Sequence, residues 1–141
     1  LCLSWWGDVL LIPKGRPAVF RAGVIAFLLG HLAYAAAFAS RGLAPVAALS
    51  AGLVISGVGW LVLRWLRPHL PAEMRLAVPA YVVVISGMLV CAVASVAAAG
   101  GPAILLGAGM FYVSDLAVAR DRFVGPGFAN RAWGLPLYYG G

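Results

Sequence analysis

The chain is a succession of long apolar runs, each ended by a short break of charged residues, prolines or glycines. The runs show no alternation of apolar and polar positions, and most are far longer than the roughly 10 residues of a membrane-spanning strand. Both features favour helices over strands. The pattern predicts six helices, at about residues 1–12, 18–40, 43–66, 74–99, 103–119 and from 129 to the chain end.

The second run carries the most informative pattern of polar positions. With a helical period, six of its residues share one side of the helix: Gly23, Phe27, Gly30, His31, Tyr34 and Phe38. The remaining positions are almost all Ala, Leu, Val and Ile. A histidine and a tyrosine on such a helix predict a face that looks into a polar interior, while the opposite face contacts lipid.

Composition extends this prediction to the whole chain. Of the 141 residues, 64% are hydrophobic and 10% are charged, whereas a soluble domain carries roughly 25% charged residues. The chain therefore lacks the polar surface of a water-soluble globule. We expect an all-α integral membrane protein: a single transmembrane helical bundle over residues 1–141, as a fragment of a longer protein truncated at both ends.

The net charge of +6 does not indicate nucleic-acid binding, because the basic residues fall between the apolar runs and do not cluster with aromatic residues. The first, third and fifth loops hold nine of the ten: Lys14, Arg16, Arg21, Arg64, Arg67, Arg75, Arg120, Arg122 and Arg131. The second and fourth loops hold only Arg41. By the positive-inside rule the odd-numbered loops are cytoplasmic, and we expect a bacterial plasma membrane.

Two carboxylates lie inside apolar runs. Asp8 is about four residues, and Asp115 about five, from the cytoplasmic end of its predicted helix, so both sit roughly 6–8 Å inside the boundary. His31 and the C-terminal tyrosines fall nearer the middle of the membrane. The sequence thus predicts a polar cavity open towards the inner leaflet, lined by Asp8, His31, Tyr34, Asp115 and one of Tyr138 and Tyr139.

Each candidate also has a structural interpretation. Asp8 could reach the lipid headgroups from its helix end, and Asp115 could form an ion pair with Arg120. His31 could serve only as a hydrogen-bond partner for a neighbouring helix, and the two tyrosines could be interfacial aromatics. Two Asp and one His could bind zinc, but no HExxH or paired-cysteine spacing accompanies them, and the sequence predicts neither a metal nor a cofactor.

Four blocks of sequence resemble the YhhN-like lysoplasmalogenase family of membrane proteins. In family order and spacing they are Ser4-Trp-Trp-Gly7-Asp8-Val-Leu-Leu, Gly23-xxx-Phe27-xx-Gly30-His31-xx-Tyr34, Gly107-Ala-Gly-Met-Phe111-xx-Ser114-Asp115 and Leu137-Tyr138-Tyr139. The resemblance implies a protein of about eight spans, of which this chain lacks the first two. It also implies an activity: family members characterised as enzymes cleave the vinyl-ether bond of lysoplasmalogens, releasing a fatty aldehyde and a glycerophospho-base.

The candidate residues suit this reaction. Vinyl ethers are hydrolysed by protonation at carbon, and water captures the resulting oxocarbenium ion. One protonated acid and one carboxylate are needed, and neighbouring buried carboxyls can divide these roles. We therefore take Asp8, Asp115 and His31 as catalytic candidates, with the identity of the acid left open and His31 orienting the pair or relaying a proton.

The expected partner is a membrane lipid of the lysophospholipid type; the oligomeric state is left open. The candidates for substrate binding are Tyr34, Tyr138, Tyr139, Ser114 and Arg120. The same residues could instead form the proton relay or pore of a proton-coupled transporter or lipid-handling protein. Against this alternative, the sequence shows no internal repeat and no pair of broken helices. A membrane protein without chemistry would not require two acids at matched depth.

Overall fold

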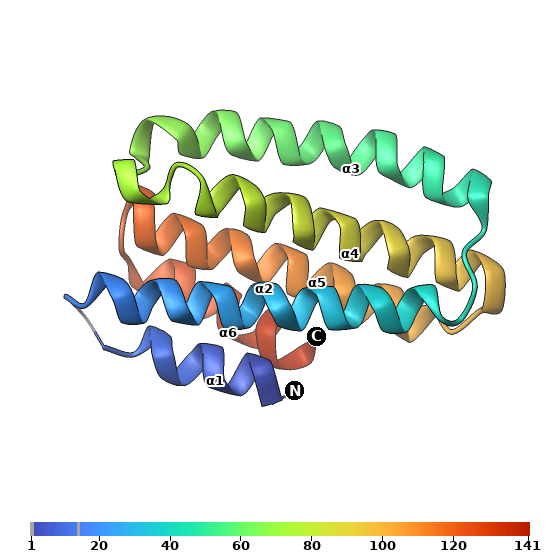
Figure 1. The fold of residues 1–141 in the computed structure, drawn as a ribbon, viewed down its shortest axis with the longest axis horizontal. Helices are drawn as coiled ribbons and strands as arrows, with labels where there is room; N and C mark the ends of the chain where they lie inside the picture. The colour runs from blue at the N-terminus through green and yellow to red at the C-terminus, as the bar shows by residue number, and fades with distance from the viewer. Residues whose placement is uncertain (1, 14) are drawn as a thin grey trace.

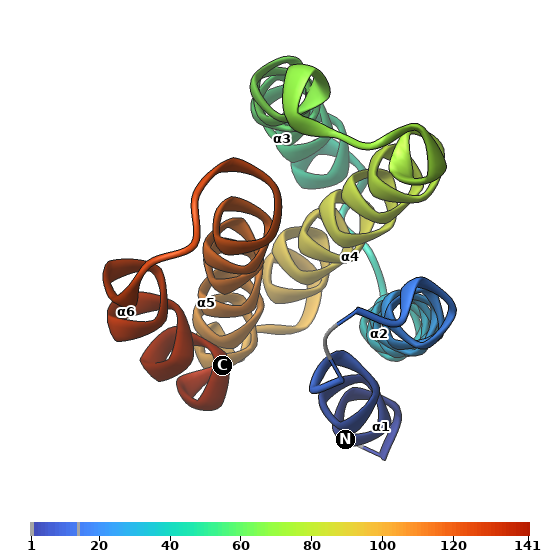
Figure 2. The same ribbon diagram turned by 90° about the vertical axis from the view of Figure 1, so that its left-hand side faces the viewer.

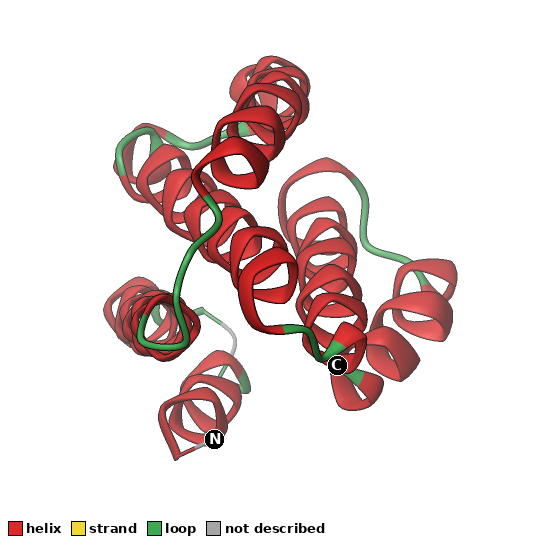
Figure 3. Cartoon of the chain, turned by 90° about the vertical axis from the view of Figure 1, so that its right-hand side faces the viewer, coloured by secondary structure: helices red, strands yellow, loops and turns green. Residues whose placement is uncertain are grey.

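The computed structural model describes residues 2–13 and 15–141, and this part of the chain folds into six α-helices without strands (Figures 1 and 3). The helices are α1 (Cys2–Leu11), α2 (Pro17–Ala39), α3 (Pro45–Leu66), α4 (Ala77–Ala99), α5 (Pro102–Ala119) and α6 (Phe128–Gly140). The predicted all-helical fold and its six helices are confirmed. Leu1 and Lys14, which the sequence assigned to the first helix and the first loop, lie outside the described residues.

Proline and glycine set most helix ends. Pro17, Pro45 and Pro102 each begin a helix, where the missing N–H costs no hydrogen bond. Gly100 and Gly101 have φ of +72° and +89° and reverse the chain between α4 and α5, a conformation that other residues rarely adopt.

Short irregular elements account for the differences from the predicted boundaries. Two 3₁₀ turns, η1 (Arg67–His69) and η2 (Ala72–Met74), join α3 to α4, so α4 begins about three residues later than predicted. A π-helical segment, η3 (Arg120–Val124), continues α5. Asp115 lies four residues from the end of α5 at Ala119, and Asp8 lies three from the end of α1. That the two carboxylates lie at the same depth in the membrane stays a prediction.

In the described part of the chain, four helices are long and apolar enough to cross a membrane: Pro17–Ala39, Pro45–His69, Ala72–Ala99 and Pro102–Val124. Their outward side chains are largely apolar. On α3, Leu49 and Leu53 are 77% and 80% exposed, which would be unfavourable in water but suits contact with lipid acyl chains. The chain is an integral membrane protein.

Helix α4 holds the bundle together, because it packs against α2, α3 and α5. Helix α1 packs on α2, and α6 packs on α5 (Figure 1). Viewed along the helices, α1 and α2 form one pair and α5 and α6 another, with α4 between the pairs and α3 outermost (Figure 2). Residues from the beginning and the end of the chain thereby approach the same interior.

Two glycines allow this close packing. A Cβ atom at Gly7 of α1 would lie 2.5 Å from Cδ2 of Phe27 in α2. A Cβ at Gly134 of α6 would lie 2.6 Å from the Cβ of Ala117 in α5. Both distances are well below van der Waals contact, so a larger residue would push α1 or α6 outward. These contacts bring Asp8 and Tyr138 towards the interior of the bundle.

Candidate functional site

A cavity of about 360 Å³ lies between the helices and is lined by side chains from all six of them. Most of the wall is apolar and includes Phe20, Phe27, Leu66 and Ile85. The polar side chains in the lining are Asp8, Tyr81, Tyr112, Asp115, Asp121, Arg122, Asn130, Arg131, Tyr138 and Tyr139. The cavity thus contains both carboxylates and both C-terminal tyrosines that the sequence analysis selected.

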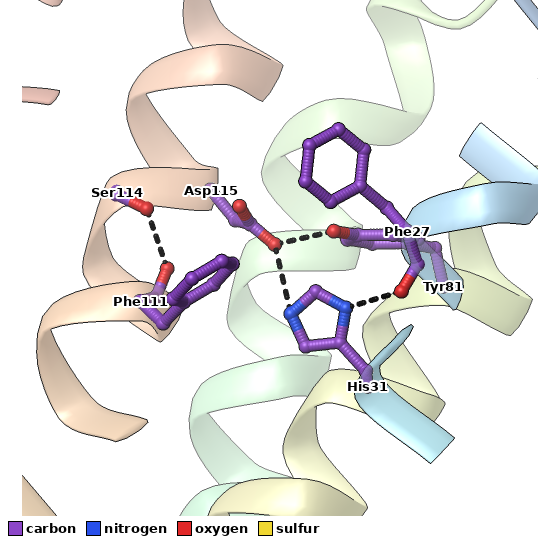
Figure 4. A network of polar contacts seen from close by, with 6 residues as sticks. All are labelled: Phe27, His31, Tyr81, Phe111, Ser114 and Asp115. Carbon is purple, nitrogen blue, oxygen red and sulfur yellow. Dashed lines mark hydrogen bonds and ion pairs between the residues drawn. The ribbon is translucent and has the colours of Figure 1, made fainter. Parts of the chain in front are cut away.

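Asp115, on α5, is held by α4 and faces α2 (Figure 4). Its Oδ2 atom accepts a hydrogen bond of 2.6 Å from the hydroxyl of Tyr81 and lies 3.8 Å from Nε2 of His31. No hydrogen bond among the described residues uses Oδ1, and the side chain is 16% exposed. One carboxyl oxygen is therefore fixed by the protein while the other is left for the cavity.

His31, on α2, has a defined tautomer. Its Nδ1 lies 2.7 Å from the carbonyl oxygen of Phe27 in the preceding helical turn. A carbonyl only accepts, so Nδ1 carries a proton and the neutral ring keeps a lone pair on Nε2. Nε2 is buried without a hydrogen-bond partner among the described residues and points towards Asp115 (Figure 4). The imidazole therefore presents an acceptor nitrogen to the Asp115 carboxyl, 3.8 Å away.

Asp8, on α1, has a phenol partner as well. The hydroxyl of Tyr138 in α6 donates a 2.7 Å hydrogen bond to Oδ2 of Asp8, so the first and last helices meet at the site. Tyr139 also lines the cavity, and its ring lies 5.1 Å from that of Tyr138. Each carboxylate therefore accepts from a tyrosine on a different helix.

Aromatic rings join the two carboxylates into one site. The ring of Phe111 lies 5.3 Å from the imidazole of His31 and 5.0 Å from the ring of Tyr138. The ring of Tyr81 lies 5.4 Å from the imidazole in an edge-to-face arrangement, a favourable geometry for aromatic pairs. Phe111 thus contacts both His31, beside Asp115, and Tyr138, which is bonded to Asp8.

The other candidates do not line the cavity. Tyr34 stacks on Phe38 with 6.2 Å between ring centres. Ser114 donates to the carbonyl oxygen of Phe111 within its own helix, at 2.7 Å. Arg120 donates to Oδ1 of Asn130, at 3.1 Å, and forms no ion pair with Asp115 among the described residues. His31 does not line the cavity either, but it contacts Asp115, Tyr81 and Phe27, which do.

Sequence reasoning did not identify Tyr81, the strongest hydrogen-bond donor to Asp115. The available signal was a phenol inside an apolar run, the same criterion that selected Tyr34. In the sequence, Arg122 and Arg131 serve mainly as orientation signals, and with Arg120 they could also form a basic rim that holds a lipid phosphate; both line the cavity. The described residues contain no cluster of three or more His, Cys, Asp or Glu side chains arranged to hold a metal.

Known proteins resemble this chain over nearly its whole length. The family model described as the YhhN family matches residues 1–141. Lysoplasmalogenase TMEM86A from Bos taurus is 32% identical over 145 aligned residues, and that from Homo sapiens is 33% identical over the same number. Each alignment covers 99% of this chain but 58% of the relative, so the chain spans somewhat more than half the length of these relatives. No solved structure matches.

Proposed function

Because the chain belongs to the YhhN family, we propose that it acts as an integral-membrane hydrolase on the vinyl-ether bond of a lysoplasmalogen-type lipid. The products would be a fatty aldehyde and a glycerophospho-base. One observation carries the proposal: two carboxylates, each hydrogen-bonded by a tyrosine, line one largely apolar cavity. Relatives at 32% and 33% identity bear the name lysoplasmalogenase, which supports the same reaction class.

The cavity suits a single-chain lipid. Its volume of about 360 Å³ falls in the range of small-molecule sites, which are mostly apolar with a few polar groups that fix orientation. The charged and amide side chains Asp121, Arg122, Asn130 and Arg131 line the cavity at the fifth loop, and Phe20, Leu66 and Phe123 line it beside the first, third and fifth loops. We propose that these loops are cytoplasmic in a bacterial plasma membrane, and that the six helices act as one transmembrane domain.

The first chemical step would be proton transfer to carbon. Asp115, which lines the cavity, donates a proton from Oδ1 to the vinyl carbon that is not bonded to oxygen. The double-bond electrons form the new C–H bond, leaving an oxocarbenium ion and an Asp115 carboxylate. The carboxylate keeps its hydrogen bond from Tyr81, and the adjacent Nε2 of His31 offers a second position for a proton.

Asp8 would then activate water. Its carboxylate, stabilised by the Tyr138 hydroxyl, stabilises the cation and takes a proton from the water that attacks it. In the collapse of the resulting hemiacetal, Asp8 returns that proton to the departing glycerol oxygen, and Asp115 takes the hydroxyl proton. Both acids regain their starting states, and the net change is the addition of one water molecule.

We assign the role of proton donor to Asp115 because Nε2 of His31 lies 3.8 Å from its carboxyl and can hold or return a proton. Asp8 also accepts from a phenol, but no imidazole of the described residues lies beside it, which suits a group that remains a carboxylate. Tyr138 and Tyr139 are proposed as substrate contacts because both line the cavity. Tyr34, Ser114 and Arg120 would influence the substrate only through the neighbours that they contact.

Deuterium labelling tests the proposed chemistry directly. Purified protein would be incubated in D₂O with a vinyl-ether lysophospholipid. The aldehyde would be captured as a stable derivative, and its deuterium content measured by mass spectrometry. Protonation at carbon predicts one deuterium at carbon 2 of the aldehyde and no turnover of the saturated alkyl-ether analogue. Aldehyde that forms without this label would contradict the mechanism.

A second candidate is a proton-coupled transporter. The buried contact between His31 and Asp115, between two membrane-spanning helices, is the kind of pair that relays protons in such proteins. Uptake of a lysophospholipid into liposomes, driven by a pH gradient and without aldehyde release, would favour this alternative over the hydrolase.

A further inference from the structure

The cavity has a basic end that the two carboxylates do not account for. Arg122, on η3, and Arg131, on α6, both line the cavity, together with Phe20 and Phe123. Their neighbour Arg120 is absent from the lining and donates a hydrogen bond to Asn130. Two guanidinium groups therefore border the cavity at this end, beside the carboxylate of Asp121 and the amide of Asn130.

Both guanidinium groups are available for a ligand. Neither makes a hydrogen bond or an ion pair with another described residue. Arg122 lies over the ring of Phe20, 4.2 Å from its centre, and this stacking orients the planar group while leaving its N–H donors free. Arg131 is exposed at the same end of the cavity.

A buried asparagine holds these two segments together. Asn130 is only 4% exposed and accepts from Arg120 at 3.1 Å while it donates to the carbonyl oxygen of Gly125 at 2.8 Å. It also donates to Oδ1 of Asp121, which accepts from the backbone N–H of Gly127 as well. The network ties η3 to the start of α6, the two segments that carry Arg122 and Arg131.

We propose that Arg122 and Arg131 bind the phosphate of the lipid headgroup; the inference extends the proposed function by naming where the headgroup lies. Arginine is suited to phosphate because its planar donors match two phosphate oxygens. Asp115 and Arg122 are seven residues apart, roughly 10 Å along a helix. The ether carbon and the phosphorus of a lysophospholipid are separated by six bonds, roughly 7 Å, so one molecule reaches both ends.

The test compares two lipids that the enzyme cannot cleave by carbon protonation: a 1-O-alkyl lysophosphocholine and the 1-O-alkylglycerol with the same tail. Binding to the purified protein in detergent is measured by calorimetry at matched micellar fractions. The phosphate-bearing lipid should bind at least tenfold more tightly. Inorganic phosphate should compete only weakly, because it lacks the tail, and strong competition would indicate a site for free phosphate, overturning the headgroup assignment.

Single substitutions test whether these two arginines cause the difference in affinity between the two lipids. Arg122→Gln and Arg131→Gln should each weaken binding of the phosphate lipid about five- to tenfold and leave the alkylglycerol unchanged. Arg122→Lys should restore only part of the affinity, because lysine keeps the charge but lacks the planar pair of donors. Arg64→Gln, on the exposed face of α3 beside Trp60, is the matched control and should change neither. Equal affinity for the two lipids, or equal losses for both in the Gln variants, would overturn the inference.

These outcomes are independent of turnover. If the predicted binding pattern is found but no vinyl ether is cleaved, the headgroup site stands and the hydrolase proposal fails. If aldehyde is released but the Gln variants bind the phosphate lipid normally, the headgroup site fails and the hydrolase proposal stands.

Discussion

Replacing Tyr81 by Phe removes one hydroxyl and leaves the aromatic ring in place. That hydroxyl donates the 2.6 Å hydrogen bond to Oδ2 of Asp115, while the ring packs edge-to-face on His31. The substitution leaves Oδ2 with only the imidazole, 3.8 Å away. The carboxyl would then be free to rotate, and Oδ1 would no longer be held towards the cavity.

The size of the effect follows from the strength of this contact. A hydrogen bond to a charged group contributes about 1.5–3 kcal/mol. At 1.36 kcal/mol for each factor of ten in rate, Tyr81→Phe should lower kcat by about 10- to 100-fold. KM should change less than about twofold, because the apolar wall that the lipid contacts is retained.

The assay is aldehyde release from a vinyl-ether lysophospholipid over a range of substrate concentrations, which separates kcat from KM. Tyr34→Phe is the matched control: its hydroxyl makes no hydrogen bond with a described residue, and its ring stacks on Phe38. We expect this variant to stay within about twofold of the wild type. Wild-type kcat in Tyr81→Phe, or an equal loss in Tyr34→Phe, would refute the role assigned to Tyr81.

Two further predictions concern the other half of the site. Tyr138→Phe removes the 2.7 Å hydrogen bond to Asp8 and should lower kcat about tenfold or more in the same assay; full activity would show that this bond is dispensable. Gly7→Ala places a Cβ 2.5 Å from the ring of Phe27 and should cost about 1–3 kcal/mol through overpacking, seen as a lower Tm. Gly87→Ala, where a Cβ meets nothing within 4 Å, is the control and should not lower Tm.

The helices were predictable because each is encoded locally. An apolar run of about 20 residues suffices to indicate a span, and residues such as Pro45 and Pro102 mark where a helix begins. The inward face of the second helix was also predictable, because the structure buries Phe27, Gly30 and His31. Periodicity within one run contains this information.

The hydrogen-bonding partners within the site were not predictable in the same way. The bond between Tyr81 and Asp115 depends on how α4 and α5 are rotated and shifted against one another, and neither run encodes that register. The bend into η3 had a similar effect, because a π-helical turn changes which side chains point inward. As a result Arg122, rather than Arg120, lines the cavity.

The central claim is that Asp115 supplies the proton that breaks the vinyl ether. The most direct test is aldehyde release from a vinyl-ether lysophospholipid by the purified protein in detergent, with wild type and Asp115→Asn measured side by side and folding checked by circular dichroism and Tm. The account predicts release by the wild type and none above background from the variant, since an amide of the same shape has no acidic proton. Release by a folded Asp115→Asn protein at the wild-type rate would contradict it.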